Sequence, residues 1–382
     1  MSADKGTADK SPKTAGKEPG LVGIVNFVRG SWLNWLLIFV PISVALELLG
    51  LPKLWLFFTS ALAIIPLAGL IGESTEQLSH RVGPGVGGLL NATFGNAPEL
   101  IIALFALRAG LQEVVKASIS GSIIGNILLV LGLSMLVGGW QRDVQRFSRT
   151  HAGASAAMLF LAVVALVMPA LFDLAIFGSL ERTAPPLESI SLLVAVVLIA
   201  TYLASLIFSL RTHRDLLTSA PHEPEVPRLS VPNSILLLVI ATALISLESE
   251  LLVDGISEAT ATLGLTEFFV GVVVVALVGN AAEHSTAVLV ARRDKMDLAV
   301  TIAVGSSTQI ALFVAPVLVF VSFFIGQPMS LVFNAFEIVG IAMSVVAISL
   351  VSLDGESNWF EGIQLLAVYL VLAIVFFFVP TV

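Results

Sequence analysis

Two short segments of the sequence resemble one another, and each places a glutamate inside an apolar stretch. Residues 95–99 are Gly-Asn-Ala-Pro-Glu and residues 279–283 are Gly-Asn-Ala-Ala-Glu, an offset of 184 positions. An ionised carboxylate near the centre of a bilayer costs about 2.5–3.5 kcal/mol or more. No lysine or arginine in the apolar stretches is placed to neutralise Glu99 or Glu283. Each glutamate must therefore be protonated or compensated by a cation, and a site that alternates between these two states exchanges protons for cations.

The side chains beside the two glutamates favour a hard metal ion. Asn96 and Asn280 supply amide oxygens about one helical turn away, and Pro98 removes a backbone donor, which frees a carbonyl group. Such an all-oxygen set suits Ca²⁺, which takes about 6–8 oxygen ligands. We therefore predict that Asn96, Glu99, Asn280 and Glu283 bind the metal and that the two glutamates also bind protons. The chain has no cysteine, which excludes disulfides and thiolate sites.

Small and polar residues recur at 121–126 and 305–309, again at the offset of 184. Small-residue packing of membrane helices explains the glycines and serines about as well as a functional role does. The amide side chains are harder to explain by packing, because an amide in hydrocarbon needs hydrogen-bond partners. We expect four of these residues to line the same cavity as the glutamates, as ligands or as supporting donors: Ser122, Asn126, Ser306 and Gln309.

Three further residues are candidates for proton or ion transfer. His284 adjoins Glu283 and could relay protons near neutral pH, although a neutral histidine on the next helix face explains it equally simply. Glu73 is expected at the end of an apolar stretch, and Glu250 near the end of another. We treat both as candidates for the ion pathway, with a solvated acid at the membrane boundary as the alternative.

The composition indicates the elements that must position these residues. Hydrophobic residues make up 57% of the 382 and charged residues 12%, and the mean hydropathy is +0.99. So few charges cannot cover a soluble protein of this size, so the chain is predicted to be an all-α polytopic membrane protein and no nucleic-acid binder. A span needs about 20 apolar residues. This criterion predicts eleven spans at about 32–50, 54–72, 86–108, 113–138, 152–171, 188–210, 233–253, 266–291, 297–321, 329–352 and 359–380.

The positive charges predict the orientation of these spans. With the N-terminus in the cytoplasm, fifteen of the 19 lysines and arginines lie in cytoplasmic segments. Lysine and arginine are enriched in cytoplasmic loops of membrane proteins. The N-terminus is therefore predicted to be cytoplasmic and the C-terminus to lie on the other side.

The recurrence at the offset of 184 indicates two repeats of opposite orientation. Eight of the 28 positions from 95 to 122 are identical in the second copy, and they fall on polar or small residues. Five spans separate equivalent points, so the copies must cross the membrane in opposite senses, as in secondary transporters. The predicted organisation is a flexible cytoplasmic tail (1–31), an extra N-terminal span (32–50), a first five-helix repeat (51–210), a cytoplasmic linker (211–232) and a second five-helix repeat (233–382).

Four segments of the sequence resemble the calcium/proton exchangers of the calcium/cation antiporter superfamily: 90–100, 279–284, 305–309 and 354–359. The resemblance covers about residues 45–380. It implies that the glutamates matching Glu99 and Glu283 bind Ca²⁺ and protons. The sodium/calcium branch usually has Thr-Ser in place of Asn96-Ala97, so the chain is similar to the proton-coupled branch. Many relatives have an acidic cluster between the two halves, and residues 211–232 lack one.

The expected function is Ca²⁺/H⁺ antiport by alternating access, with Ca²⁺ and H⁺ as substrates, the lipid bilayer as surroundings and no cofactor. Two alternatives keep the fold: coupling to Na⁺, and transport of Mn²⁺ or another divalent cation. Two others change the class: an intramembrane hydrolase, which the absence of His-Glu-x-x-His and Gly-x-Ser-x-Gly motifs disfavours, and a passive channel. A homo-oligomer is left open. A bacterial plasma membrane is the expected location, with a vacuolar membrane as the alternative.

Overall fold

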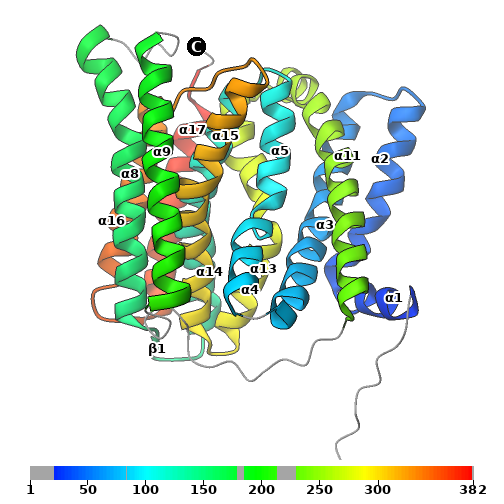
Figure 1. The fold of residues 1–382 in the computed structure, drawn as a ribbon, viewed down its shortest axis with the longest axis horizontal. Coiled ribbons are helices and arrows are strands. Elements are labelled where there is room, and N and C mark those ends of the chain that lie inside the picture. Colours follow the sequence, from blue (N-terminus) through cyan, green and yellow to red (C-terminus); the bar gives the residue numbers. More distant parts are fainter. Residues whose placement is uncertain (1–20, 83, 179–184, 213–228, 381–382) are drawn as a thin grey trace, which may run out of the picture.

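The computed structural model describes residues 21–82, 84–178, 185–212 and 229–380 of the chain. The predicted tail and most of the predicted linker lie outside these residues. The described chain is almost entirely helical, and the long helices run side by side along one axis of the molecule (Figure 1). Two short strands, β1 (Gln145–Arg146) and β2 (Glu356–Ser357), pair antiparallel at one end.

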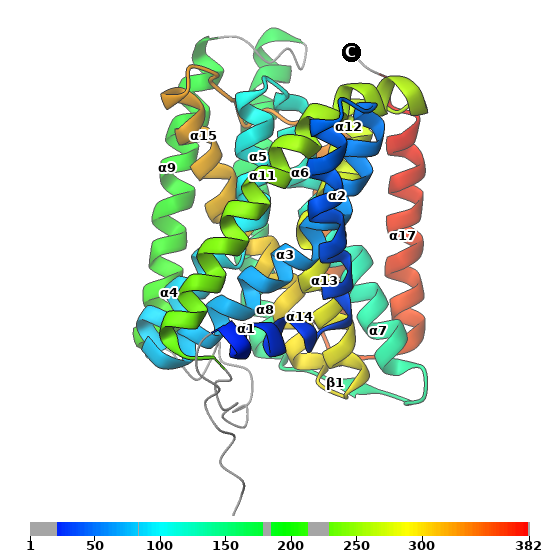
Figure 2. The same cartoon turned by 90° about the vertical axis from the view of Figure 1, so that its right-hand side faces the viewer.

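An N-terminal group of helices precedes the two halves of the molecule. It consists of α1 (Leu21–Arg29), η1 (Trp32–Ile38) and α2 (Phe39–Leu48). The axes of Gly23–Arg29 and Trp32–Leu48 are bent by 105° to each other. In both views α2 lies beside α3 (Lys53–Val82) and α11 (Val231–Leu263), which themselves pack along one another (Figures 1 and 2). Ser43 of α2 donates a hydrogen bond of 2.7 Å to the buried Glu248 of α11, which fixes α2 to the second half.

The two halves of the chain use the same order of elements. After α3, the first half continues with α4 (Pro84–Phe94), α5 (Ala97–Arg108), α6 (Gln112–Ile124), η2 (Gly125–Val130), α7 (Leu131–Gly139), α8 (Arg149–Phe177), α9 (Pro185–Ile207) and η3 (Phe208–Thr212). After α11, the second half continues with α12 (Glu267–Phe269), η4 (Val270–Val275), α13 (Ala276–Arg292), α14 (Met296–Gln309), η5 (Ile310–Val314), α15 (Ala315–Phe324), α16 (Ala335–Val351) and α17 (Trp359–Phe377).

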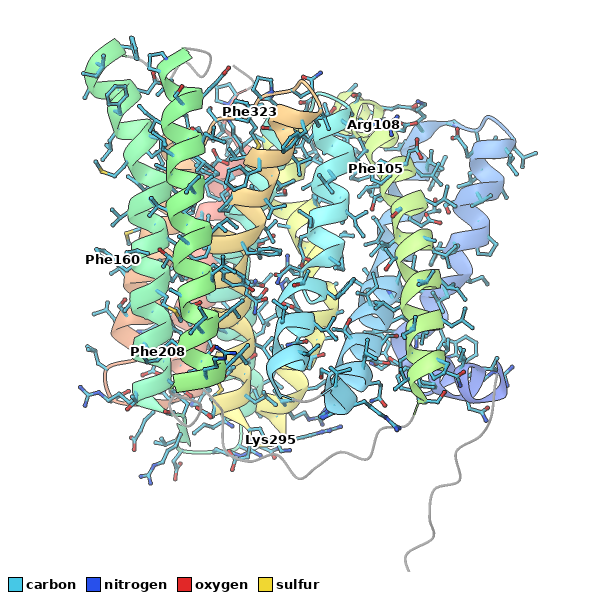
Figure 3. The ribbon with its side chains drawn as sticks, in the orientation of Figure 1. Phe105, Arg108, Phe160, Phe208, Lys295 and Phe323 are labelled. Atoms are coloured by element: carbon cyan, nitrogen blue, oxygen red, sulfur yellow. The ribbon has the colours of Figure 1, made fainter. Side chains whose placement is uncertain are left out.

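Several equivalent elements have nearly equal bounds at the offset of 184, in particular α6 with α14 and α7 with α15. The π-helical turns η2 and η5 interrupt equivalent helices at equivalent places, and α5 and α13 end at the equivalent residues Arg108 and Arg292. Figure 3 shows Arg108 at one end of the molecule and Lys295, which follows α13, at the opposite end. Equivalent helices therefore run in opposite directions.

Eight of the described helices are long and apolar enough to cross a membrane, or nine if the bent pair counts as one span. Two of the eleven expected spans fall short of this criterion. The expected span 86–108 is broken between α4 and α5, and the expected span 329–352 becomes helical only at Ala335. Residues 329–333 are instead non-helical and buried, so their apolar side chains face protein without forming a helix.

Candidate cation and proton site

The first glutamate lies where a helix begins in the interior of the molecule. The helical path from α4 to α5 breaks at Gly95-Asn96, and Asn96 is the N-cap residue of α5. Pro98 occupies the first turn, where its missing N–H is no loss, and Glu99 is the acidic residue of that turn. A helix N-terminus presents free N–H groups and a positive end of the helix dipole. The break therefore places a carboxylate, an amide and the start of a helix together in the protein interior.

The second glutamate lies on a helix that does not break. α13 passes through residues 279–283 in continuous helical conformation, and the adjustment occurs earlier, in the π-helical turn η4. A Cβ atom added to Gly279 would lie 3.2 Å from Cγ of Glu99, so the glycine permits close approach of α5. The Glu283 carboxylate lies close enough to Glu99 for the charges of the two side chains to interact. The structure thus brings the two predicted carboxylates together from opposite halves of the chain.

Three of the four predicted metal ligands carry a buried oxygen with no hydrogen-bond partner in the described chain. These atoms are Oδ1 of Asn96, Oε2 of Glu99 and Oε2 of Glu283. A buried polar atom without a partner costs free energy, and such atoms are rare in folded proteins. Two carboxylate oxygens and one amide oxygen are the ligand chemistry of Ca²⁺. The residues therefore fit a calcium ion as substrate, with protons satisfying the carboxylates when the ion is absent.

The fourth predicted ligand, Asn280, is fully hydrogen-bonded. Its Nδ2 donates to Oγ of Ser122 and to the carbonyl of Ala276, both at 2.9 Å, and its Oδ1 accepts from Nδ2 of Asn126 at 3.4 Å. Asn126 also donates to Oγ of Ser306 at 3.1 Å, and Ser306 in turn lies within hydrogen-bonding range of Glu283. Asn280 thus links polar side chains of the first half to the second half.

Two other predicted residues, Gln309 and His284, form hydrogen bonds with asparagine side chains of the site. Nδ2 of Asn96 donates to Oε1 of Gln309, which connects the broken helix of the first half to α14. Nε2 of His284 lies 2.9 Å from Oδ1 of Asn126. Because an amide oxygen only accepts, Nε2 must carry the hydrogen in this pair. His284 is therefore a donor in the network, with Nδ1 as its remaining ring nitrogen.

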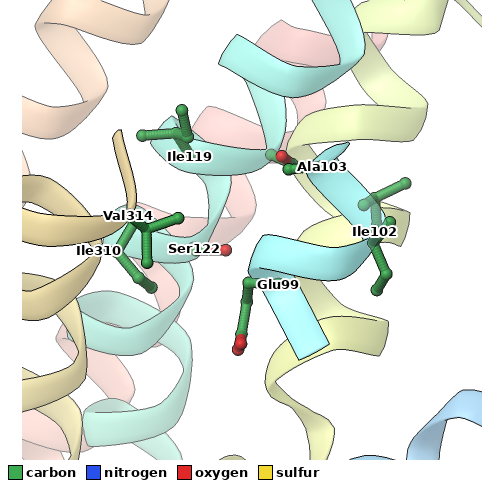
Figure 4. Close-up of a pocket in the computed structure, with 9 residues that line it drawn as sticks. Glu99, Ile102, Ala103, Ile119, Ser122, Ile310 and Val314 are labelled. Atoms are coloured by element: carbon green, nitrogen blue, oxygen red, sulfur yellow. The ribbon is translucent and has the colours of Figure 1, made fainter. Parts of the chain in front are cut away.

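A small cavity adjoins Glu99. Its wall is formed by Glu99, Ile102, Ala103, Ser118, Ile119, Ser122, Val275, Ile310 and Val314. Figure 4 shows Glu99 on one side of the cavity and Ile310 and Val314 of η5 on the other. Ala103 and Ser118 lie nearer than Glu99 to the end marked by Arg108, because α5 runs toward that end and α6 returns from it (Figure 3). The cavity therefore leads from Glu99 toward the Arg108 end.

The two remaining candidates, Glu73 and Glu250, lie on other helices than Glu99 and Glu283. Glu250 is exposed on α11, away from the buried face of that helix. Glu73 is part-buried and lies within α3, which continues to Val82 and does not end beside Glu73. A Cβ atom added to Gly69, one turn earlier, would lie 3.7 Å from Cβ of Ala282, so Glu73 lies on the helix that packs against α13. No described group of three or more His, Asp or Glu side chains is arranged to hold a metal.

The sequence-based reasoning missed two residues. Ser118 lines the cavity and was not singled out. Lys116 was not singled out either; it is 5% exposed within α6, and its charge interacts with that of Glu337. It does not neutralise the central glutamates. The spacing Lys116-x-Ser118-x-Ser120-x-Ser122, which alternates between two faces of one helix, was the available signal.

Comparison with known proteins identifies the family. The sequence matches the sodium/calcium exchanger protein family over residues 52–211 and 233–378. These two stretches contain both glutamate motifs and nearly all of both halves. The chain belongs to this family, and like its relatives it is a multi-pass membrane transporter and not an enzyme.

Individual relatives align along nearly the whole chain. The chain is 47% identical to a Ca²⁺/H⁺ antiporter of Synechocystis over 365 residues, which cover 91% of this chain and 97% of that one. It is 39% identical to a vacuolar calcium ion transporter of Schizosaccharomyces pombe, with 94% and 88% covered. The solved structure of native YfkE is similar with a TM-score of 0.79 and 40% identity, and the match covers 91% of this chain and all of that one.

Proposed function

We propose that this protein is a Ca²⁺/H⁺ antiporter that exports Ca²⁺ from the cytoplasm against inward proton flow. The observation that carries the proposal is the meeting of Glu99 and Glu283, each with a buried, unpartnered carboxylate oxygen. A relative with 47% identity is named a Ca²⁺/H⁺ antiporter, which supports the same pair of substrates here. No cofactor is needed, because Ca²⁺ is the cargo.

The proposed exchange is a competition at one site. Ca²⁺ binds the ionised carboxylates of Glu99 and Glu283 together with the amide oxygen of Asn96. Protons bind the same carboxylates and displace the ion, because a protonated carboxyl is a poor ligand for a divalent cation. Gln309 orients Asn96, and Asn280, Ser122, Asn126 and Ser306 hold the helices around the site. Transport follows if the site opens to one side of the membrane at a time.

The proposed topology has eleven spans in two inverted five-helix repeats, 51–210 and 233–382, with the segment 32–50 as an extra span. Residues 1–31 form a cytoplasmic tail and residues 211–232 a cytoplasmic linker. The opposite placement of Arg108 and Lys295 supports the inversion, and the charge count supports a cytoplasmic N-terminus. The Lys295 end is then cytoplasmic, and the cavity beside Glu99 leads outward. A bacterial plasma membrane is the proposed location, with a vacuolar membrane as the alternative.

Cysteine labelling tests this topology without background, because the natural chain has no cysteine. Ser148 and Gln327 are both exposed, the first before α8 and the second between α15 and α16. A membrane-impermeant thiol reagent should label Ser148→Cys only from the cytoplasmic face and Gln327→Cys only from the outer face. Labelling of both from the same face would overturn the proposed inversion.

Transport in everted membrane vesicles tests the function. A proton gradient that is acid inside should drive uptake of ⁴⁵Ca²⁺, and collapse of the gradient with a protonophore should stop it. Uptake that follows a sodium gradient and ignores pH would favour Na⁺ coupling in the same fold. Mn²⁺ as a competitor measures selectivity among divalent cations. Flux without saturation or counter-transport would indicate a channel and contradict the proposal.

A further inference from the structure

A second group of buried polar side chains lies on the opposite face of α6 from the cavity. Ser118 and Ser122, four residues apart, line the cavity beside Glu99. Lys116 and Ser120, also four residues apart, lie about 200° around the helix from them, because two residues separate the pairs. Ser120 Oγ donates to Oε1 of Glu337 at 2.9 Å. One helix thus presents one polar face to the transport site and another to α16.

Lys116 and Glu337 bring opposite charges into this buried group. Lys116 is 5% exposed and Glu337 is 3% exposed, so neither side chain reaches solvent. Nζ of Lys116 donates to Oγ of Ser330 at 3.3 Å, and its charge interacts with that of Glu337. A lysine that only anchored a helix end would extend its ammonium group to the membrane surface. Lys116 instead extends toward residues of the second half of the chain.

The partners of Lys116 and Ser120 lie on and beside a buried, non-helical segment. Residues 329–333, between α15 and α16, are buried although they are not helical. Such a segment needs side-chain partners for its backbone groups. Ser322 accepts from the N–H of Met329 at 2.9 Å, and Ser191 accepts from the N–H of Leu331 at 2.8 Å. Oε2 of Glu337 accepts from the N–H of Asn334 at 2.8 Å. The Glu337 carboxylate thus bonds the end of the segment with one oxygen and α6 with the other.

We propose that Lys116 and Glu337 are a positioning pair that holds α6 against residues 329–337 and thereby sets cation access to Glu99 from the Arg108 end. The inference rests on the proposed function and adds residues outside its ligand set. Lys116 and Glu337 touch neither Glu99 nor Glu283 in the described contacts, and the equivalent positions of the other repeat are Val300 and Gly153. The pair therefore exists at one end of the molecule only, and its effect should be confined to one face of the membrane.

The test compares Lys116→Met, Glu337→Gln and the double variant, with Lys116→Arg as the charge-conserving control. Removal of one partner leaves the other charge buried and uncompensated, whereas removal of both leaves none. Ca²⁺ uptake rates are measured from each face, in right-side-out and everted vesicles, and are normalised to the amount of folded protein. The Ca²⁺ KM for each face is obtained from these rates. Each single variant should raise the outer-face KM about tenfold, a typical coupling between sites, and leave the cytoplasmic-face KM within about twofold. The double variant and Lys116→Arg should return within about threefold of the wild type.

Three results would overturn the positioning pair: single variants with unchanged KM, equal changes on both faces, or a double variant as impaired as the singles. The wild type in the same vesicles tests the proposed function separately. A readout independent of transport uses Ser118→Cys in the cysteine-free chain. The rate at which a small thiol reagent labels it from the outer face should change with Lys116→Met and recover when Glu337→Gln is added. An unchanged rate would also contradict the pair, whatever ion the protein moves.

Discussion

The two halves of the site begin from the same Gly-Asn-Ala motif and differ in how fully their side chains are hydrogen-bonded. On the first half, Asn96 donates to Gln309 and its Oδ1 has no partner in the described chain. On the second half, Asn280 uses both its oxygen and its nitrogen within a network that includes Ser122 and Asn126. Glu99 of the first half lines the cavity, whereas Asn280 of the second half is enclosed by polar contacts.

The difference shows that equal motifs acquire different hydrogen-bond partners once they are packed. The backbone breaks before Glu99, where an unpartnered amide oxygen is available to a cation. The backbone stays helical through Glu283, where the neighbouring amide is engaged in contacts between helices. We infer that Asn96 binds the ion directly and that Asn280 mainly holds the helices in place. The two glutamates remain equivalent in that each has a buried, unpartnered oxygen.

The largest expected effect is at Glu99 and Glu283, because each half contributes one buried, unpartnered carboxylate oxygen there. Glu99→Gln and Glu283→Gln should each reduce proton-driven Ca²⁺ uptake by more than about 100-fold, beyond the cost of losing a supporting residue at a metal site. Glutamine keeps the volume and one oxygen but cannot ionise, so it imitates a permanently protonated state. Uptake of ⁴⁵Ca²⁺ into vesicles measures the loss, and size-exclusion profiles check folding. Near wild-type uptake by either variant would refute the paired mechanism.

The pH dependence tests whether the two glutamates act as one site. As pH falls, protons occupy the carboxylates, so the apparent affinity for Ca²⁺ should weaken. Each displaced proton contributes about a tenfold loss per pH unit below the titration range. Two interacting carboxyls titrate together, so the slope should exceed one proton. Measurement of the Ca²⁺ KM between mildly alkaline and mildly acidic pH gives the slope. A slope of one or less would mean that a single carboxyl exchanges.

The difference between the halves is tested by matched alanine substitutions at Asn96 and Asn280. Asn96→Ala should raise the Ca²⁺ KM about 10- to 100-fold, as loss of a residue at a metal site does. Asn280→Ala removes the hydrogen bond that Ser122 accepts and one of the contacts of Asn126, and a buried polar group left unsatisfied costs about 1–3 kcal/mol. Its main effect should therefore be a lower melting temperature of the purified protein, with a smaller change in KM. The opposite pattern would assign the direct contact to Asn280.

Much of the fold follows from the sequence, and the unpredicted parts have identifiable physical reasons. Long apolar runs predicted α6 with α7 and α14 with α15 to within a few residues. Hydropathy reports burial and not backbone conformation, so it also predicted a helix across 329–333, which is buried but not helical. The sequence does contain local signals for a helix that begins later, at Ala335. Gly326, at φ +73°, ends the preceding helix, and Asn334 with Glu337 forms a capping box that begins α16.

The site was predictable in its residue types but not in its asymmetry. The repeated motif at 95–99 and 279–283 indicated the two glutamates and their amides. Whether the motif breaks a helix depends on its surroundings. Pro98 favours a helix start at Ala97, whereas Ala282 is compatible with a continuous helix. The hydrogen-bond partners of Asn96 and Asn280 come from the other half of the chain, and no spacing rule within one repeat gives such contacts.

The smallest expected effect concerns His284, which only the second half has, since its equivalent is Leu100. Nε2 of His284 donates to Asn126, so its role in the structure is that of a neutral donor. Glutamine places an N–H near the same position, so His284→Gln should keep the Ca²⁺ KM and its pH profile within about threefold. His284→Leu removes the donor and leaves Oδ1 of Asn126 unpaired, which costs about 1–3 kcal/mol, so it should be the more impaired variant. If His284→Gln instead kept the KM but lost dependence on the proton gradient, His284 would be a proton relay. The second half of the site would then take part in proton transfer through two titrating groups, Glu283 and His284, and the first half through Glu99 alone.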